Sequence, residues 1–366
     1  MLSLKKTVPI LFCFCFLFAS SACAAVPLIY CSDLFHPHDD PDDHFDLACI
    51  YAIEEFDLKA IILDQGLKQK EQPGLIPVMQ MNALTGREVP SVSGLEKPLV
   101  SPEDTGEDQP ASAQAGVETI LAILRESPEP VTIITVGSLR DVAAAFNRDA
   151  ALFHQKLKRL YAFIGNTGGG FREYNVNLDL NAYRCIMNAG LPLYWTPCFD
   201  GGLWENNGRA SYWVSPHNQL LEGVPEALLN FFIYMIEKKD SADPVAAIFE
   251  PVNEREKEAF LAEKRNLWCC AVFPHAADRF YICRKGKCLA LPPHSLRQGD
   301  LPAAPFSYVP VKVRLDEEGV EHCPDPDGTE ILCFHMTDPQ NYARHMTELS
   351  VQLLHELAGL IRTSEK

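Results

Sequence analysis

Short apolar runs alternate with segments of helical periodicity between residues 26 and 196, and this alternation restricts the fold more than any other feature of the sequence. Strands are predicted for 26–32, 58–63, 131–136, 159–164 and 192–196. Helices are predicted between them over 45–56, near 76–84, over 113–125, from Leu139 and near 180–188. Uninterrupted apolar runs suit strands that are buried on both faces. We therefore expect an α/β fold, with an open, mostly parallel, Rossmann-like sheet and helices on both faces.

The final third of the chain shows a weaker pattern. Strands are predicted at 311–315 and 331–334, and an amphipathic helix over 340–362. No linker-like segment precedes them, so they are interpreted as the edge of the sheet and the closing helix of a single domain, residues 25–366.

Residues 1–24 are predicted to be a signal peptide. Lys5 and Lys6 precede the apolar run PILFCFCFLF, and the small residues SSACAA follow it, which is the order of a secretory signal. The run is shorter than the roughly 20 residues that span a bilayer. Cys23 leaves lipidation open, because S-S-A-C loosely resembles a bacterial lipobox. We expect an exported protein, periplasmic or secreted, with a lipid anchor at Cys23 as the alternative.

Charge restricts the partners. The 366 residues include 32 lysines and arginines against 49 acidic residues, a formal charge of −17. This excess of negative charge argues against nucleic acid or an anionic membrane surface as a partner and favours small or cationic molecules.

The cysteines do not form the pattern of a small disulfide-stapled scaffold. Ten of the 13 cysteines follow the predicted signal peptide at widely spread positions. Cys283 and Cys288 flank the sequence RKGK, which predicts a hairpin turn, and they are the expected disulfide pair.

An acidic segment follows the first predicted strand. Residues 33–46, DLFHPHDDPDDHFD, contain six carboxylates and three histidines. Like charges at this density require a cation or solvent nearby, and Ca²⁺ or Mg²⁺ is the natural partner of carboxylate oxygens. The alternative is a solvated acidic loop in which Asp42 and Asp43 lie at a helix N-terminus.

A glycine-rich segment follows the strand 159–164. Residues 165–179, GNTGGGFREYNVNLD, combine glycines with closely spaced polar groups. Glycine allows the backbone to approach a ligand closely, but no lysine follows as a Walker motif requires, so phosphate binding is not expected. Ligands of such sheets bind at the carboxyl ends of the strands, where both segments are predicted to lie.

Taken in order, four motifs resemble the inosine-uridine preferring nucleoside hydrolase family. The D-I-G-x-D-x-D-D form of its aspartate turn is similar to Asp33 and Asp40-Pro41-Asp42-Asp43, with LFHPHD inserted. Its T-G-P-L-T-N-like turn is similar to VGSLRD at 136–141, and its M-G-G…E-F-N…D-P-x-A-A segment to residues 164–182. Its late H-D-P-x-A motif is similar to ADPVA at 242–246.

The resemblance implies Ca²⁺-dependent hydrolysis of the N-glycosidic bond of a ribonucleoside or related small riboside, and a homo-oligomer. The Ca²⁺ ligands it implies are Asp33, Asp43, Asp243 and the backbone carbonyl of Val136. Asp33 would also accept a proton from the attacking water. The sugar-binding residues it implies are Asp42, Glu173, Asn175 and Asn166.

Departures from the family pattern leave alternatives open. Ala242 stands where many purine-cleaving members carry a histidine that protonates the leaving base. His36, His38 or His44 could supply that acid, although exposed loop positions are the favoured interpretation, and Asp64 is either a site residue or a turn residue. An exported, non-catalytic sugar- or nucleoside-binding protein is therefore the alternative function. A purely structural calcium site is a third possibility.

Overall fold

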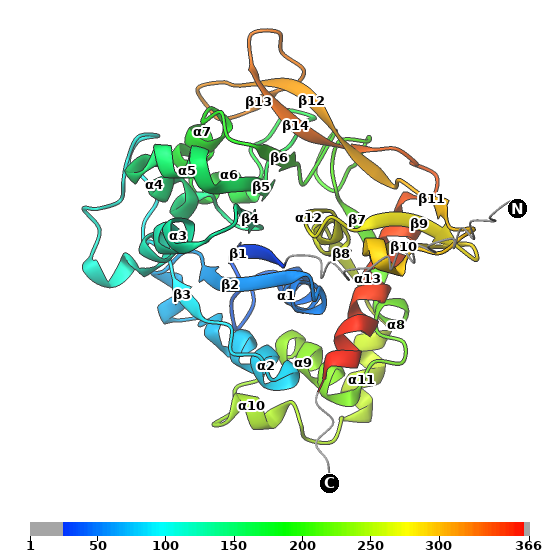
Figure 1. The fold of residues 1–366 in the computed structure, drawn as a ribbon. Helices are drawn as coiled ribbons and strands as arrows, with labels where there is room; N and C mark the ends of the chain where they lie inside the picture. The colour runs from blue at the N-terminus through cyan, green and yellow to red at the C-terminus, as the bar shows by residue number, and fades with distance from the viewer. Residues whose placement is uncertain (1–24, 362–366) are drawn as a thin grey trace, which may run out of the picture.

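A nine-stranded mixed sheet forms the centre of the computed structural model, which describes residues 25–361 (Figure 1). Its strands are β1 (Val26–Ser32), β2 (Phe56–Leu63), β3 (Ser91–Ser93), β4 (Val131–Thr135), β5 (Leu157–Phe163), β6 (Leu193–Thr196), β12 (Phe306–Leu315), β13 (Glu321–His322) and β14 (Thr329–Met336). They lie in the order β13-β12-β14-β6-β5-β4-β1-β2-β3, and only β12 runs antiparallel to the other strands. The predicted α/β fold is confirmed. The predicted signal peptide, Cys23 and residue 362 lie outside the described residues.

Helices cover both faces of the sheet (Figure 1). One layer contains α3 (Ala115–Glu126), α4 (Arg140–Arg148), α5 (Ala150–Lys156) and α7 (Leu180–Met187); the other contains α1 (Asp42–Ala52), α12 (Phe273–Ala276) and α13 (Tyr342–Leu360). Along β1, Leu28 and Tyr30 belong to the core beneath α1, whereas Ile29 and Cys31 belong to the core beneath α3. Because successive side chains of a strand point to opposite faces, two covered faces require the apolar run seen in the sequence.

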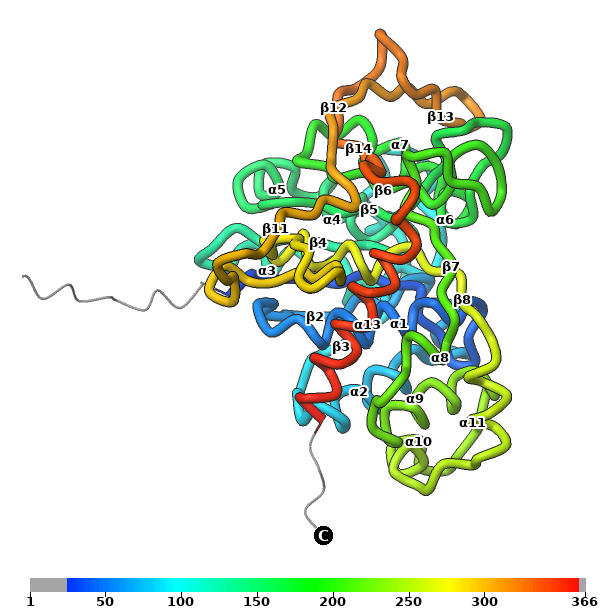
Figure 2. The backbone as a smooth tube through the Cα atoms, turned by 90° about the vertical axis from the view of Figure 1, so that its right-hand side faces the viewer, coloured from blue at the N-terminus to red at the C-terminus, as the bar shows by residue number. Residues whose placement is uncertain are grey.

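The remaining elements lie around this sandwich. They are α2 (Leu75–Thr85), α6 (Tyr174–Leu178), α8 (His217–Leu220), α9 (Glu226–Ile236), α10 (Pro244–Ala247), α11 (Glu254–Leu261), the pair β7 (Trp213–Pro216) and β8 (Lys264–Leu267), and the small sheet of β9 (Phe280–Arg284), β10 (Lys287–Leu291) and β11 (Leu301–Pro302). Figure 2 shows α8 to α11 at one end of the molecule and β12 to β14 at the other. Within residues 25–361, no helix is both long and apolar enough to cross a bilayer.

Cys283 and Cys288 face each other across the β9–β10 hairpin, whose turn is Lys285-Gly286. Both thiols are free in the structure. The expected disulfide therefore stays a prediction, although the hairpin places its two residues directly opposite.

Arg279, just before β9, connects three segments that are far apart in the sequence. Its buried guanidinium donates hydrogen bonds to Glu55 at 2.7 Å, after α1, and to Glu356 of α13 at 2.8 Å. Removing one partner of a buried ion pair leaves uncompensated charge, which costs far more than the pair itself contributes.

We expect Arg279→Ala to lower the free energy of unfolding by about 3 kcal/mol, because Glu55 and Glu356 lose a buried cation. Arg344→Ala is the matched control, since Arg344 is half exposed and its pair with Glu348 is a surface i,i+4 pair worth roughly 0.5 kcal/mol or less. Urea denaturation of both variants measures the difference. Equal losses in the two variants would contradict the role assigned to Arg279.

Candidate functional site

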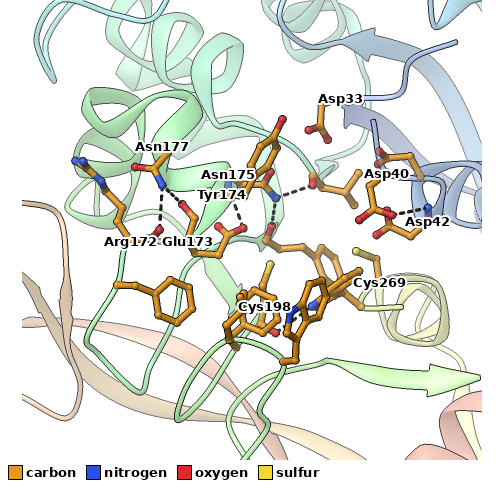
Figure 3. Close-up of a pocket in the computed structure, with 18 residues that line it drawn as sticks. Asp33, Asp40, Asp42, Arg172, Glu173, Tyr174, Asn175, Asn177, Cys198 and Cys269 are labelled. Atoms are coloured by element: carbon orange, nitrogen blue, oxygen red, sulfur yellow. Dashed lines mark hydrogen bonds between the residues drawn. The ribbon is translucent and has the colours of Figure 1, made fainter. Parts of the chain in front are cut away.

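The strand order creates a crevice at the carboxyl end of β1. From β1 the chain first builds the sheet outward through β2 and β3, and then returns to build β4, β5 and β6 on the other side. Ligands of open α/β sheets bind at such a switch point. A cavity of about 440 Å³ lies here, within the size range of small-molecule sites (Figure 3).

The cavity has two chemically different walls. The acidic wall is formed by Asp33, Asp40, Asp42 and Asp43, and Glu173 and Asn175 face it from the loop after β5 (Figure 3). The apolar wall carries aromatic rings, one leucine and two thiols: Phe171, Phe199, Leu203, Trp204, Trp268, Cys198 and Cys269. The site thus offers oxygen ligands on one side and flat apolar surface on the other.

Asp64, at the end of β2, positions the turn after β4. Its carboxylate accepts hydrogen bonds from the Ser138 backbone N–H at 2.8 Å and from the Gln65 backbone N–H at 2.7 Å. It does not line the cavity. By holding Ser138, it fixes the turn after β4 beside Asp33. A Cβ on Gly137 would lie 2.8 Å from Asp33 Oδ1, so this turn requires glycine.

Buried like charges dominate the electrostatics of the acidic wall. Burial, aided by the nearby Asp64 carboxylate, raises the pKa of Asp33 to about 8. Burial and the neighbouring Asp33 also raise the pKa of Asp43 well above its ordinary value, although the Ser32 hydroxyl donates to Asp43 at 3.2 Å. These carboxyl groups hold protons tightly because burial and their mutual repulsion both disfavour the charged form.

Glu173 and Asn175 connect the neighbouring strand ends. Glu173 caps α6 by accepting the N–H groups of Asn175 at 2.9 Å and Val176 at 3.3 Å, and it also accepts the N–H of Gly165 at 3.0 Å. Burial nevertheless raises the pKa of Glu173 to about 7. The Asn175 amide donates to the Val136 carbonyl at 3.0 Å. The glycine-rich loop is thus fastened to the turn after β4.

Glu321 supports this loop from behind, and nothing in the sequence pattern marked it. Its Oε1 accepts the Asn166 N–H at 3.1 Å and the Tyr183 hydroxyl at 2.8 Å. Its Oε2 is buried without a hydrogen-bond partner. Burial raises the pKa of Glu321 to about 7. Because Glu321 lies 155 residues from Asn166, only the fold reveals the contact.

Six of the predicted site residues line the cavity: Asp33, Asp42, Asp43, Val136, Glu173 and Asn175. Two do not. Asp243 is exposed and caps α10 by accepting the Ala246 N–H at 2.9 Å. Helix α10 packs on α2, and Asp243 does not line the cavity. Its predicted role as a ligand beside Asp33 and Asp43 stays a prediction. The Asn166 amide bonds within its own turn, to the Gly169 carbonyl and the Gly168 N–H, and is not on the cavity surface.

The favoured interpretation of the three early histidines is corrected. His36, His38 and His44 are buried rather than exposed. His36 bonds to the Lys239 carbonyl at 2.7 Å and stacks on Tyr234. None of the three lines the cavity, so none supplies an acid to it.

Only part of the predicted set of metal ligands lies on the cavity surface. Across residues 25–361, no three His, Cys, Asp or Glu side chains are arranged as a metal-binding group. Asp33, Asp43 and the Val136 carbonyl reach the cavity without the predicted Asp243. Their oxygen chemistry suits a hard divalent cation, and the uncompensated repulsion among the buried carboxylates is what such a cation would relieve.

Comparison with protein families gives a match to the model of the inosine-uridine preferring nucleoside hydrolases over residues 38–259. Among curated proteins, the pyrimidine-specific ribonucleoside hydrolases RihA of Citrobacter koseri and of Enterobacter sp. strain 638 are 30% and 31% identical over 190 residues. The match covers 46% of this chain, and 59% and 58% of those relatives. The chain therefore spans less than two thirds of the length of the relatives it matches.

Solved structures share the fold. The purine-preferring ribonucleoside hydrolase from Gardnerella vaginalis superposes with a TM-score of 0.55 at 14% identity, covering 91% of this chain and 98% of that one. The inosine-uridine preferring nucleoside hydrolase from Bacillus anthracis gives a TM-score of 0.52 at 13% identity, with 92% and 100% covered. These likenesses confirm the predicted nucleoside hydrolase fold.

Replacement of Glu321 by glutamine tests how the carboxyl group that contacts the glycine-rich loop affects stability. Because the pKa of Glu321 is raised, the folded protein binds its proton more tightly than the unfolded chain, and the stability it contributes is lost as the pH rises from 4.5 to about 7. The free energy of unfolding of Glu321→Gln, relative to that of the wild type, is expected to increase by about 1 to 3 kcal/mol between pH 4.5 and 8.5.

Glu318→Gln, on an exposed residue of the same hairpin, is the control and should show no such growth. Denaturant unfolding at a series of pH values measures both variants. A pH-independent difference for Glu321→Gln would contradict the raised pKa.

Proposed function

We propose a function from one premise: the chain belongs to the inosine-uridine preferring nucleoside hydrolase family. Membership confirms the expected resemblance and the expected class, a family of hydrolases that act on N-glycosyl compounds. For this chain we propose hydrolysis of the N-glycosidic bond of a ribonucleoside or related small riboside. The observation that carries the proposal is the cavity at the end of β1, where an acidic wall faces an aromatic one.

The acidic wall is proposed to hold the sugar. Asp42, Glu173 and Asn175 present carboxylate and amide oxygens to the cavity, and such oxygens accept hydrogen bonds from ribose hydroxyls. Glycosidic cleavage develops positive charge on the sugar ring, which carboxylates around it stabilise. The aglycone then lies against the apolar wall.

Asp33 is proposed to take the proton of the attacking water. An ionised carboxylate beside the attacking water can accept its proton at neutral pH, and Asp33 lies on the cavity surface at the end of β1. The water oxygen bonds to the anomeric carbon as the bond from that carbon to the base nitrogen breaks. The bonding pair leaves with the base, and the water proton passes to Asp33.

A divalent cation, Ca²⁺ in our proposal, belongs on Asp33, Asp43 and the Val136 carbonyl. The buried oxygen donors and their unrelieved repulsion support it. Such an ion would act as a Lewis acid and lower the pKa of a bound water. We further propose export of the protein, supported by the sequence pattern of residues 1–24.

Asp33→Asn is expected to lower turnover at least about 1000-fold, because it removes the proton acceptor while keeping the shape of the side chain. Asp39→Asn is the matched control: Asp39 is exposed, pairs with Lys68 and does not line the cavity. Ribose released from uridine, inosine and 4-nitrophenyl β-D-riboside is measured with Ca²⁺. Activity retained by Asp33→Asn would refute the assigned role.

Chelation with EDTA tests whether activity and stability depend on a bound cation. EDTA is expected to abolish ribose release, and added Ca²⁺ to restore it and to raise the melting temperature, because the cation neutralises buried carboxylates. Asp33→Asn should weaken the Ca²⁺-induced shift in melting temperature, and Asp39→Asn should not. A riboside-dependent rise in melting temperature without turnover would favour the binding protein over the hydrolase.

A further inference from the structure

We propose that the preferred aglycone is a cationic, N-linked aromatic ring, of which a pyridinium is the simplest. This inference rests on the riboside hydrolysis proposed above and names the substrate class of the same cavity. It follows from three features of the cavity: the apolar wall carries no general acid for a neutral base, acidic side chains predominate among the lining residues, and aromatic rings offer flat surface.

The apolar wall offers no acid suited to protonating a neutral base. All eleven histidines lie in the described part of the chain, and none lines the cavity. The Trp268 indole N–H already donates to the Cys198 carbonyl at 3.0 Å. A neutral purine or pyrimidine leaves readily only when a nearby group of pKa near 7 protonates it, so this wall gives such bases little help.

Apart from the carboxyl groups of the acidic wall, the protic side chains of the cavity keep their protons. Burial raises the pKa of both thiols, Cys198 and Cys269, well above the ordinary value. Burial, with Asp33 and Asp43 nearby, raises the pKa of the Tyr174 phenol to about 12. General acids of such high pKa transfer protons poorly at neutral pH.

The charge of the cavity favours a cation. Five acidic side chains line it, and Arg172 is the one basic residue among the described lining residues. Two further cations near the acidic wall pair with carboxylates outside the cavity, Lys68 with Asp39 and Arg265 with Glu263. With a divalent cation on Asp33 and Asp43, three acidic side chains remain on the cavity surface: Asp40, Asp42 and Glu173.

The aromatic wall suits a flat positive ring. Phe199, Trp204 and Trp268 form a cluster of three rings: the Phe199 centroid lies 5.5 Å from that of Trp204 and 6.0 Å from that of Trp268, and the centroids of the two indoles are 6.0 Å apart. Trp204 is 48% exposed, so one indole remains open at the rim. Indole faces attract cations, and the attraction increases where water is excluded.

The chemistry balances without a leaving-group acid. Water adds its oxygen to the anomeric carbon and gives a proton to Asp33. The bond between the anomeric carbon and the ring nitrogen breaks, and its electron pair stays on nitrogen. The positive charge of the ring is cancelled, so a neutral pyridine departs with no proton from the protein.

Substrate choice is tested with the wild-type protein and Ca²⁺. The probes are 1-(β-D-ribosyl)-3-carbamoylpyridinium, uridine, inosine and 4-nitrophenyl β-D-riboside, a neutral riboside whose aglycone also leaves without an acid. We expect kcat/KM for the pyridinium riboside to exceed that for uridine and inosine at least about 100-fold. Uridine or inosine cleaved as efficiently as the pyridinium would overturn the inference and leave the proposed function standing. No ribose from any probe would overturn the proposed function itself.

Recognition of charge is tested separately from reactivity. We expect 1-methyl-3-carbamoylpyridinium to inhibit cleavage of the nitrophenyl riboside at least about 10-fold more strongly than neutral nicotinamide, with the advantage shrinking as salt rises. Trp204→Leu should reduce this advantage about 5-fold, and Asp40→Asn should also reduce it. Equal inhibition by both compounds would overturn the inference. So would rapid cleavage of uridine that Tyr174→Phe alone abolishes, since Tyr174 would then be the missing acid.

Discussion

Burial of several carboxylates at one edge of a parallel sheet is the constraint on which the rest of the site depends. Away from the cavity, these groups are satisfied by the protein: Asp64 by the Ser138 N–H, and Asp179 by Arg140 at 3.1 Å and the Leu99 N–H at 2.9 Å. Asp33 and Asp43 lie at the same edge but face the cavity. The protein thus neutralises the outer carboxylates itself and leaves those of the cavity to be neutralised by what binds there.

The two walls have different origins in the chain. The acidic wall comes from the turn after β1, inside or just before the segment that matches the family. Trp268 and Cys269 of the apolar wall, and Glu321 behind the glycine-rich loop, come from the chain beyond residue 259. In the proposed function, the sugar would therefore bind mainly to residues within or next to the family match, and the aglycone would also contact residues beyond it.

Much of the fold, and the location of the cavity, could be predicted from local pattern. The run 26–32 is β1 as predicted, because a strand buried on both faces must be apolar throughout. The local pattern marked the segments after two predicted strands, and the roles of Asp33 and Glu173 within them came from the resemblance to the family. Asp243 shows why a short motif is ambiguous, because an Asp-Pro pair is also an ordinary helix start, which is what it forms. Glu321 and Trp268 carry no local signal, since only long-range packing brings them to the loop and the cavity.

The contact between Glu321 and Asn166 also bears on how the protein is made. The strands from β1 to β6 are complete by residue 196, but the loop that presents Glu173 gains its support only when β13 docks. A ribosome must therefore release most of the chain before the cavity takes its final shape. Completion of the cavity is in this sense a late event in biosynthesis, because the support of the glycine-rich loop awaits Glu321.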